Sequence, residues 1–220
     1  MRVYCPPEAA PTYAAHLEAA MLKPFEGSGE LLELAKVMDA FVIGPAAGID
    51  EATRSNVETL ASTEAALVID ADAVTVFRDE PEALFALLDE KDVLTPHAGE
   101  FERLFPGVLE AGPDKIAAAR EAARRAGCTV LLKGPDTVIA APDGRAVVNT
   151  RSTPWLATAG SGDVLAGIVG GLLAGGMPSF EAACAGAWMH GDAGVRFGPA
   201  LCAEDLPGML PQVVAGLMGR

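Results

Sequence analysis

The glycine-rich segment 159–163, Ala-Gly-Ser-Gly-Asp, has the residue types needed to bind an anion and to move a proton. Its small residues let backbone N–H groups converge at the start of the apolar segment that follows, and a helix N-terminus with converging amides binds anions. We therefore expect Gly160, Ser161 and Gly162 to hold the negative charge that develops during phosphoryl transfer. Asp163 is the candidate general base toward a substrate hydroxyl. The alternative is that Asp163 only caps the helix, a position that Asp favours.

A second candidate segment is Lys133, Gly134, Pro135, Asp136 and Thr137, which lies between two apolar runs that predict strands. A lysine at the end of a strand can reach the phosphates of a nucleotide. It can equally be a solvated charge, and the segment taken alone favours that simpler alternative.

The loop 44–48, Gly-Pro-Ala-Ala-Gly, and two nearby acids are weaker candidates. The loop follows an apolar run, and Gly48 permits a ligand to approach the backbone closely, although such loops are also common as simple turns. It is neither a Walker loop, since no Gly-Lys-Ser/Thr is present, nor a Gly-x-Gly-x-x-Gly motif. Asp70 and Asp72 end the next apolar run, where they either cap a helix or tune the phosphate side of the site.

Thr95, His97 and Glu100 form a third polar cluster, directly after a predicted strand. His97 can hydrogen-bond a ligand, and Glu100 can hold Mg²⁺ through water, because Mg²⁺ usually keeps several of its waters. The alternative is a helix entry, with Thr95 or His97 as the cap and Glu100 in the first turn. His190, farther along, is expected to be a packed or capping histidine rather than a catalyst.

The elements that must position these residues alternate between strands and helices. The carboxyl ends of four apolar runs, after Ile43, Ile69, Leu94 and Leu132, carry the polar clusters. Alternating strands and helices predict a mostly parallel sheet covered on both faces, with ligands at the carboxyl ends of the strands. Strands are expected within 1–7, 40–43, 66–74, 92–95 and, three times, 129–149. Helices are expected at 8–21, 50–63, 81–90, 114–128, 164–176, 179–197 and near the end of the chain, with a further short helix at the end of 92–107.

Composition narrows the class of protein further. The 220 residues are 50% hydrophobic, so one domain spanning 1–220 can bury a sizeable core. The net charge of −14 repels nucleic acid and anionic membranes, so neither is an expected partner. The four cysteines form no Cys-x-x-Cys pair and no Cys/His cluster, which favours reduced thiols in a cytoplasmic protein. No apolar run reaches the ~18 residues of a membrane span, and the N-terminus lacks the regions of a signal peptide.

Together, these motifs resemble one family. The ordered series GPAAG, VIDADAV, LTPHAGEFERL, LLKGPDTVIA, ATAGSGDVLAGIVGGLLAGG and HGDAG is similar to that of the ADP- or ATP-dependent NAD(P)H-hydrate dehydratases. The resemblance covers nearly the whole chain from Ala40 onward. It implies the ribokinase-like fold, a three-layer αβα sandwich with a mostly parallel central sheet.

The resemblance also implies a function. These enzymes repair NADH and NADPH that have been hydrated at C6 of the nicotinamide ring: they remove the water from the S form and release AMP (or ADP) and phosphate. It implies that Gly48, His97 and Asp163 contact the hydrate. The nucleotide would be bound by the segment from Lys133 to Thr137 and by Gly160, Ser161 and Gly162. Glu100 matches the acid of a superfamily magnesium motif, and the family members imply a homotetramer.

The chain departs from the family pattern in two places. Ala46 stands where the family usually has glycine, which is costly if the backbone there has a positive φ. The chain also begins at what resembles the second strand of the family, so the first strand-helix unit is expected to be lacking and a sheet edge to be uncovered. Two alternatives to the dehydratase therefore stay open. One is a small-molecule kinase of the same superfamily, of the hydroxymethylpyrimidine type, and the other is a nucleotide-binding protein without turnover.

Overall fold

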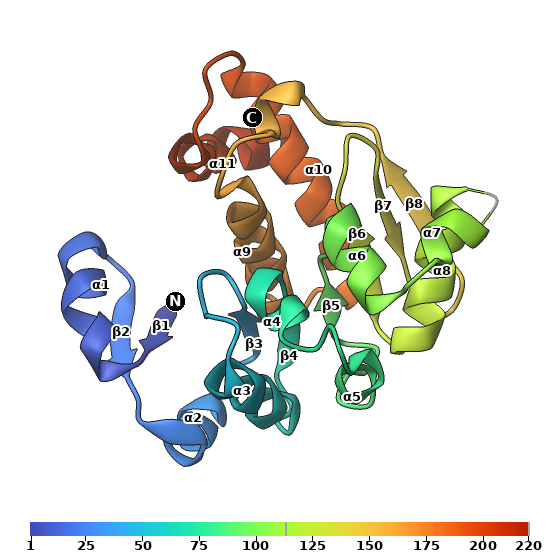
Figure 1. The fold of residues 1–220 in the computed structure, drawn as a ribbon. Helices are drawn as coiled ribbons and strands as arrows, with labels where there is room; N and C mark the ends of the chain where they lie inside the picture. Colours follow the sequence, from blue (N-terminus) through green and yellow to red (C-terminus); the bar gives the residue numbers. More distant parts are fainter. Residues whose placement is uncertain (113, 220) are drawn as a thin grey trace.

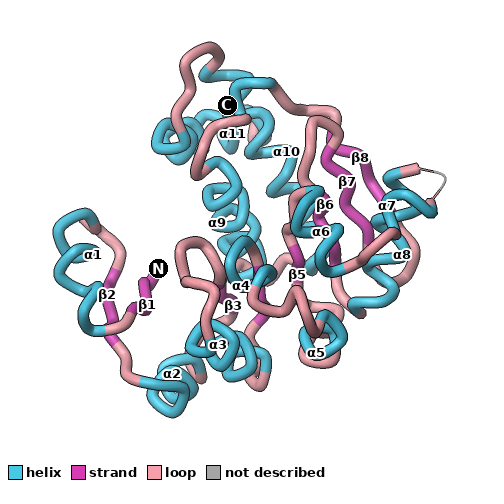
Figure 2. The backbone as a smooth tube through the Cα atoms, viewed as in Figure 1, coloured by secondary structure: helices cyan, strands magenta, loops and turns pink. Residues whose placement is uncertain are grey.

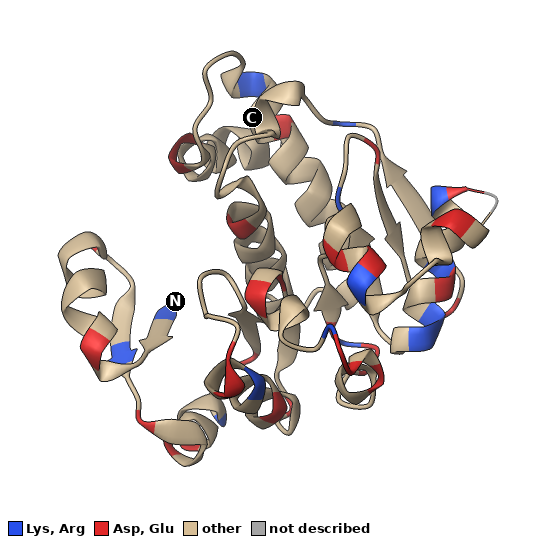
Figure 3. Ribbon diagram, viewed as in Figure 1, with Lys and Arg blue, Asp and Glu red and all other residues tan. Residues whose placement is uncertain are grey.

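A six-stranded, mostly parallel sheet organises the computed structural model, which describes residues 1–112 and 114–219 (Figure 1). The strands lie side by side in chain order: β3 (Ala40–Ile43), β4 (Ala66–Ile69), β5 (Val93–Leu94), β6 (Thr129–Leu132), β7 (Thr137–Ala140) and β8 (Ala146–Asn149). Strands β3 to β6 are parallel, whereas β7 and β8 are antiparallel to their neighbours. None of these six strands contains a charged residue, and Figure 3 shows the charges on helices and loops around them.

Helices cover both faces of this sheet because its strands bury side chains in both directions. In β4, Leu67 and Ile69 enter one core while Val68 enters the core on the other face. The Leu67 face packs against α3 (Glu51–Ala61), α4 (Ala71–Thr75), α5 (Pro81–Phe85), α6 (Ala98–Leu104) and α8 (Lys115–Ala126), with α7 (Val108–Ala111) beside α8. The Val68 face packs against α9 (Ser161–Ala174) and α10 (Ser179–Phe197), and α11 (Leu206–Leu217) packs on α10. The expected three-layer αβα architecture is confirmed.

A smaller unit precedes the sheet and projects from it (Figures 1 and 2). In it β1 (Arg2–Cys5) pairs in parallel with β2 (Met21–Pro24), as a separate two-stranded sheet with α1 (Ala10–His16). The unit is joined to the body through α2 (Gly27–Ala35), which packs on α3, and through Tyr4, whose ring lies 5.8 Å from that of Phe41. Within the described residues, β3 has a strand neighbour on one side only, so the expected uncovered edge is present.

The helix expected at 8–21 is wrong in its second half. After a short 3₁₀ turn (Pro7–Ala9), α1 ends at His16 and buries none of its residues, so packing does not hold the next turn in a helix. Met21 instead opens β2, opposite Arg2 of β1. The strand expected through 66–74 is also too long: β4 stops at Ile69 and Asp70 begins α4. Helices α2, α4 and α7 were not predicted.

The other expected elements are confirmed, with boundaries that shift by a few residues. Helix α10 occupies 179–197 as predicted, and the three strands of 129–149 form as a meander. Two further 3₁₀ turns, Pro154–Leu156 and Ala203–Asp205, connect the last elements. Among the described residues, no helix combines the length and hydropathy that a membrane crossing requires.

Candidate functional site

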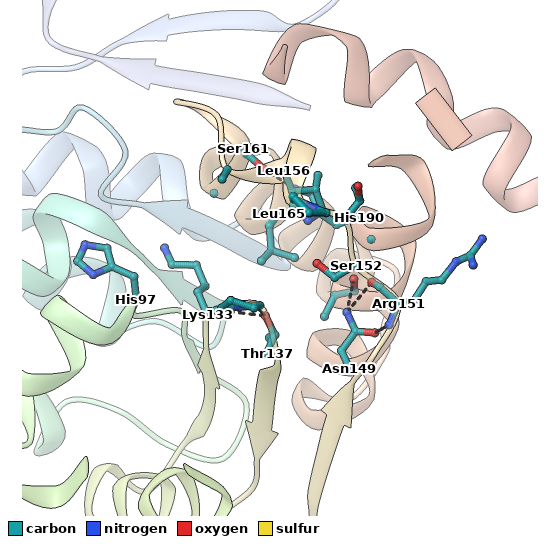
Figure 4. A pocket seen from close by; sticks show the side chains of 18 of the residues that line it. His97, Lys133, Thr137, Asn149, Arg151, Ser152, Leu156, Ser161, Leu165 and His190 are labelled. Atoms are coloured by element: carbon teal, nitrogen blue, oxygen red, sulfur yellow. Dashed lines mark hydrogen bonds between the residues drawn. The ribbon is translucent and has the colours of Figure 1, made fainter. Parts of the chain in front are cut away.

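The polar segments meet at a pocket of about 900 Å³ at the carboxyl ends of the sheet strands (Figure 4). The strands bring His97 and Lys133 together there as neighbours in an isolated bridge, with the Lys133 N–H donating to the Pro96 carbonyl at 2.8 Å. From the opposite side, the start of α9 contributes Ser161 and Gly162. Of the residues expected in the site, His97, Lys133, Gly134, Pro135, Thr137, Ser161 and Gly162 line this pocket.

The glycine-rich loop forms the N-terminus of α9, as the sequence predicted. Gly160 is the residue before the helix and has φ of 79°, a conformation that favours glycine. The Ser161 N–H donates to the Thr158 carbonyl at 3.3 Å, but no side chain caps this helix start, which leaves the N–H groups of Gly162 and Asp163 available for a ligand. This arrangement supplies the converging N–H groups of an anion site.

Asp163 lies in the first turn of α9 but is not its cap, so the capping alternative is not supported. Its side chain is exposed and accepts no cap hydrogen bond. Partial burial raises the pKa of Asp163, as do the negative charges of Asp70 and Asp72, while Lys133 lowers it. A carboxylate with a raised pKa accepts a proton more readily, which suits a general base.

His190 is a packed histidine, as expected, and it contacts the glycine-rich loop. Its Nε2 lies 3.0 Å from the hydroxyl oxygen of Ser161, and both side chains are buried. Figure 4 shows the two side chains together on the pocket wall opposite Lys133. Burial lowers the pKa of His190 to about 4, so this imidazole is neutral near pH 7.

The expectation of a solvated Lys133 is wrong. Its side chain is only 19% exposed, and its ammonium lies 2.7 Å from Asp70 Oδ1 and 3.8 Å from Glu100 Oε2. Asp70 is 2% exposed and makes no cap hydrogen bond to α4, so its carboxylate serves the ion pair instead. The ammonium also lies close to the loop, since a Cβ on Gly162 would be 3.5 Å from it.

His97 and Glu100 form the helix entry that was the alternative to a ligand site. His97 is the N-cap of α6: the N–H groups of Gly99 and Glu100 donate to its Nδ1, and the His97 N–H donates to Glu100 Oε2 at 2.8 Å. This reciprocal pair is a capping box. His97 still lines the pocket although it caps α6, because the His97 ring is about half exposed there.

Gly48 does not line the pocket but sits in the adjacent loop. Its N–H donates to Asp72 Oδ2 at 2.9 Å, so Asp72 orders the loop 44–48. Within that loop Ala46 has φ of 54°, which is the unfavourable case anticipated for an alanine there. Asp136 lies outside the pocket lining, where it accepts a hydrogen bond from Lys115 at 2.9 Å.

Sequence reasoning missed the wall made by the segment after β8. Asn149, Arg151, Ser152 and Leu156 line the pocket opposite Lys133. The Asn149 amide donates to the Ala187 carbonyl, which fixes this wall on α10. A signal was present in the HGDAG motif, because its buried Asp192 binds the guanidinium of Arg151 from that segment and also that of Arg196.

The sheet order, the helices on both faces and the pocket at the strand ends define a protein of the ribokinase-like class. A solved structure from Enterococcus faecalis, described as a ribokinase-like superfamily protein, has a TM-score of 0.78 at 26% identity and covers 96% of this chain and 75% of its own. A family model described as NAD(P)H-hydrate dehydratase matches residues 1–214, and the chain belongs to this family.

Named relatives agree with this family. A bifunctional NAD(P)H-hydrate repair enzyme of Mycobacterium tuberculosis is 47% identical over 146 residues, 66% of this chain and 30% of the relative. An ADP-dependent (S)-NAD(P)H-hydrate dehydratase of Neisseria meningitidis is 44% identical over 169 residues, 73% of this chain and 56% of the relative. The chain thus spans less than two thirds of either relative. The Bacillus subtilis ADP/ATP-dependent dehydratase, co-crystallised with ATP/Mg²⁺, has a TM-score of 0.74 at 25% identity, with coverage of 94% and 77%.

Proposed function

We propose that this chain removes water from the S form of hydrated NADH or NADPH, using ADP or ATP as the phosphate donor. Family membership and the named dehydratase relatives support this proposal. The site supports it independently, because the start of α9 and the Lys133 ammonium line one pocket, and the unengaged carboxylate of Asp163 lies in the first turn of that helix. Those three groups are the parts that phosphoryl transfer to a hydroxyl requires.

The nucleotide is assigned to the side of the pocket that Lys133, Gly134, Pro135 and Thr137 line, with Asp136 in the same turn. The loop residues Gly160, Ser161 and Gly162 would donate hydrogen bonds to the oxygens of its terminal phosphate at the start of α9. The Lys133 ammonium, beside Gly162, would offset the charge that develops on that phosphate.

The hydrate is assigned to the side of Asp163, with Gly48 and His97 as further contacts. Asp163 takes the proton of the C6 hydroxyl while the oxygen attacks the terminal phosphorus and AMP (or ADP) leaves. Phosphate then departs from C6 with the electrons of the C–O bond, and the ring carbon C5 loses a proton. The double bond between C5 and C6 is thereby restored, and the net change is loss of water from the ring and hydrolysis of one phosphate bond.

The residues present fit a Mg²⁺ ion that is held through water molecules rather than by direct protein ligands. Among the described residues no group of three His, Cys, Asp or Glu side chains is placed to hold a metal directly. The buried carboxylate of Glu100, 3.8 Å from the Lys133 ammonium, is a hard oxygen donor, and Mg²⁺ is commonly held by one carboxylate, waters and substrate phosphates. When bound with the nucleotide, Mg²⁺ would neutralise phosphate charge. Glu100 would hold it through water.

The position of Asp163, exposed in the first turn of an uncapped helix, is the observation that carries the proposal. The test mixes purified protein with hydrated NADH, Mg²⁺ and either ADP or ATP, and follows the near-ultraviolet absorbance of reduced nicotinamide. A rise that depends on nucleotide supports the repair reaction and identifies the donor. A phosphorylated product that accumulates without a rise would indicate the kinase, and ADP binding with no reaction would indicate the protein without turnover.

The family also suggests an assembly and a compartment. We propose a homotetramer, to be tested by sedimentation velocity, and a cytoplasmic location, which the four free cysteines fit.

A further inference from the structure

Asp70 is a buried carboxylate that none of the assignments above uses. It follows β4, and its carbonyl lies against Gly44 so closely that a Cβ at that glycine would be 1.7 Å from the carbonyl oxygen. Its N–H donates to the Ile43 carbonyl at 3.1 Å. The end of β3 therefore fixes the backbone of Asp70, while its side chain is left to act elsewhere.

That side chain reaches across the sheet to Lys133. Asp70 follows β4 and Lys133 follows β6, so the 2.7 Å ion pair spans the intervening end of β5. Glu100 Oε2 is more distant from the ammonium, at 3.8 Å. A flexible four-carbon side chain is thus held in one place by a carboxylate that is itself 2% exposed.

The ion pair lies against the glycine-rich loop. A Cβ on Gly162 would be 3.5 Å from Lys133 Nζ and 3.9 Å from Asp70 Oδ2. The next residue is Asp163. The charged groups that act on Asp163 are Asp70 and Asp72, which raise its pKa, and Lys133, which lowers it.

We propose that Asp70 is a positioning residue: it holds the Lys133 ammonium beside Gly162, where the transferred phosphate is assigned. This inference rests on the proposed function for the identity of the phosphate. The removal of one negative charge would not weaken the attraction of the remaining lysine for a nucleotide. The loss of its anchor would misplace the ammonium during transfer, and a misplacement of about 1 Å can cost on the order of a hundredfold in rate.

The test uses the nearly isosteric Asp70→Asn. The expected result is a kcat lowered by roughly tenfold to a hundredfold, with an unchanged or lower Kd for ADP. In a Lys133→Gln background, Asp70→Asn should lower kcat by less than twofold, because the group that it positions is gone. The control Asp143→Asn removes an exposed acid that pairs with Arg145 and lies outside the site, and it should keep the kcat of the wild type. An equal loss of kcat in both backgrounds, or a wild-type kcat in Asp70→Asn, would overturn the inference.

A second readout does not depend on activity. The Asp163 carboxyl can be titrated by NMR in the wild type and in Asp70→Asn, with Asp163→Asn to assign its signal. The pKa of Asp163 should fall in Asp70→Asn, because one of the charges that raises it is removed. If the wild type is inactive but the pKa of Asp163 still falls in Asp70→Asn, the proposed function is refuted, whereas the placement of Asp70 beside the loop is supported. No shift would refute that placement.

Discussion

Gly191→Ala tests how the segment after β8, which forms one wall of the pocket, packs against α10. A Cβ at this position would lie 1.7 Å from the Arg151 carbonyl oxygen and 2.7 Å from its carbon, whereas real Cβ atoms essentially never come within 3.0 Å. These are backbone atoms, so the segment after β8 must move by more than about 1 Å. Overpacking costs typically 1–3 kcal/mol, and the upper value of about 3 kcal/mol applies here because a backbone cannot rotate away, while the helix gains about 1 kcal/mol from the exchange of glycine for alanine. We expect a net loss of about 2 kcal/mol.

Urea unfolding measures this loss, and the expected fall in midpoint is about 0.7 M for a slope near 3 kcal/mol/M. Because Arg151 and Ser152 line the pocket, the Kd for ADP should rise as well. The matched control is Gly171→Ala in α9, where nothing lies within 4 Å of the added carbon, and it should be stabilised by about 0.5–1 kcal/mol. If Gly191→Ala is as stable as the control and binds ADP normally, the segment is not seated on α10 as described.

Three further substitutions probe other parts of the molecule. Asp163→Asn should lower kcat by about 10²–10⁴-fold and leave the Kd for ADP, measured by calorimetry, nearly unchanged; a near-normal kcat would exclude Asp163 as the base. Lys133→Ala should raise the KM for nucleotide by about tenfold or more in steady-state assays and lower kcat at least as far as Asp70→Asn does, and an unchanged KM would refute its placement at the phosphates. Burial raises the pKa of Asp92 from 3.8 to about 6, so its contribution to stability is present below pH 4 and is lost as pH rises through 6. In urea unfolding across that range, the stability of the wild type minus that of Asp92→Asn should fall by roughly 2 kcal/mol, and a constant difference would contradict the shift.

The parts of the site that follow from local sequence could be predicted. The glycine-rich loop opens a helix because its residues set the backbone at that point, and His97 with Glu100 has the spacing of a capping box. The sheet could be predicted from the alternation of apolar runs with helical periodicity.

The parts that depend on distant residues could not be predicted. Lys133 is held in a partly buried position by Asp70, which lies 63 positions away in the chain and meets it across the sheet. The pocket wall at Asn149 and Arg151 depends on bonds to α10. In the same way, Met21 belongs to a strand because β1 pairs with it, which the helical spacing of 8–21 does not show.

The open edge of β3 bears on how the protein behaves in concentrated solution. Asp39 and Ile43 direct their carbonyls to β4, so by alternation the N–H and C=O groups of Ala40 and Val42 point outward. Such an edge is a template for pairing with another chain, and neither a charge nor a proline within β3 blocks it. Mutual repulsion from the net charge of −14 opposes edge-to-edge association. That repulsion vanishes near the isoelectric point of about 4.5 and weakens in high salt, so we expect edge-to-edge association to be favoured in mildly acidic, salty buffers.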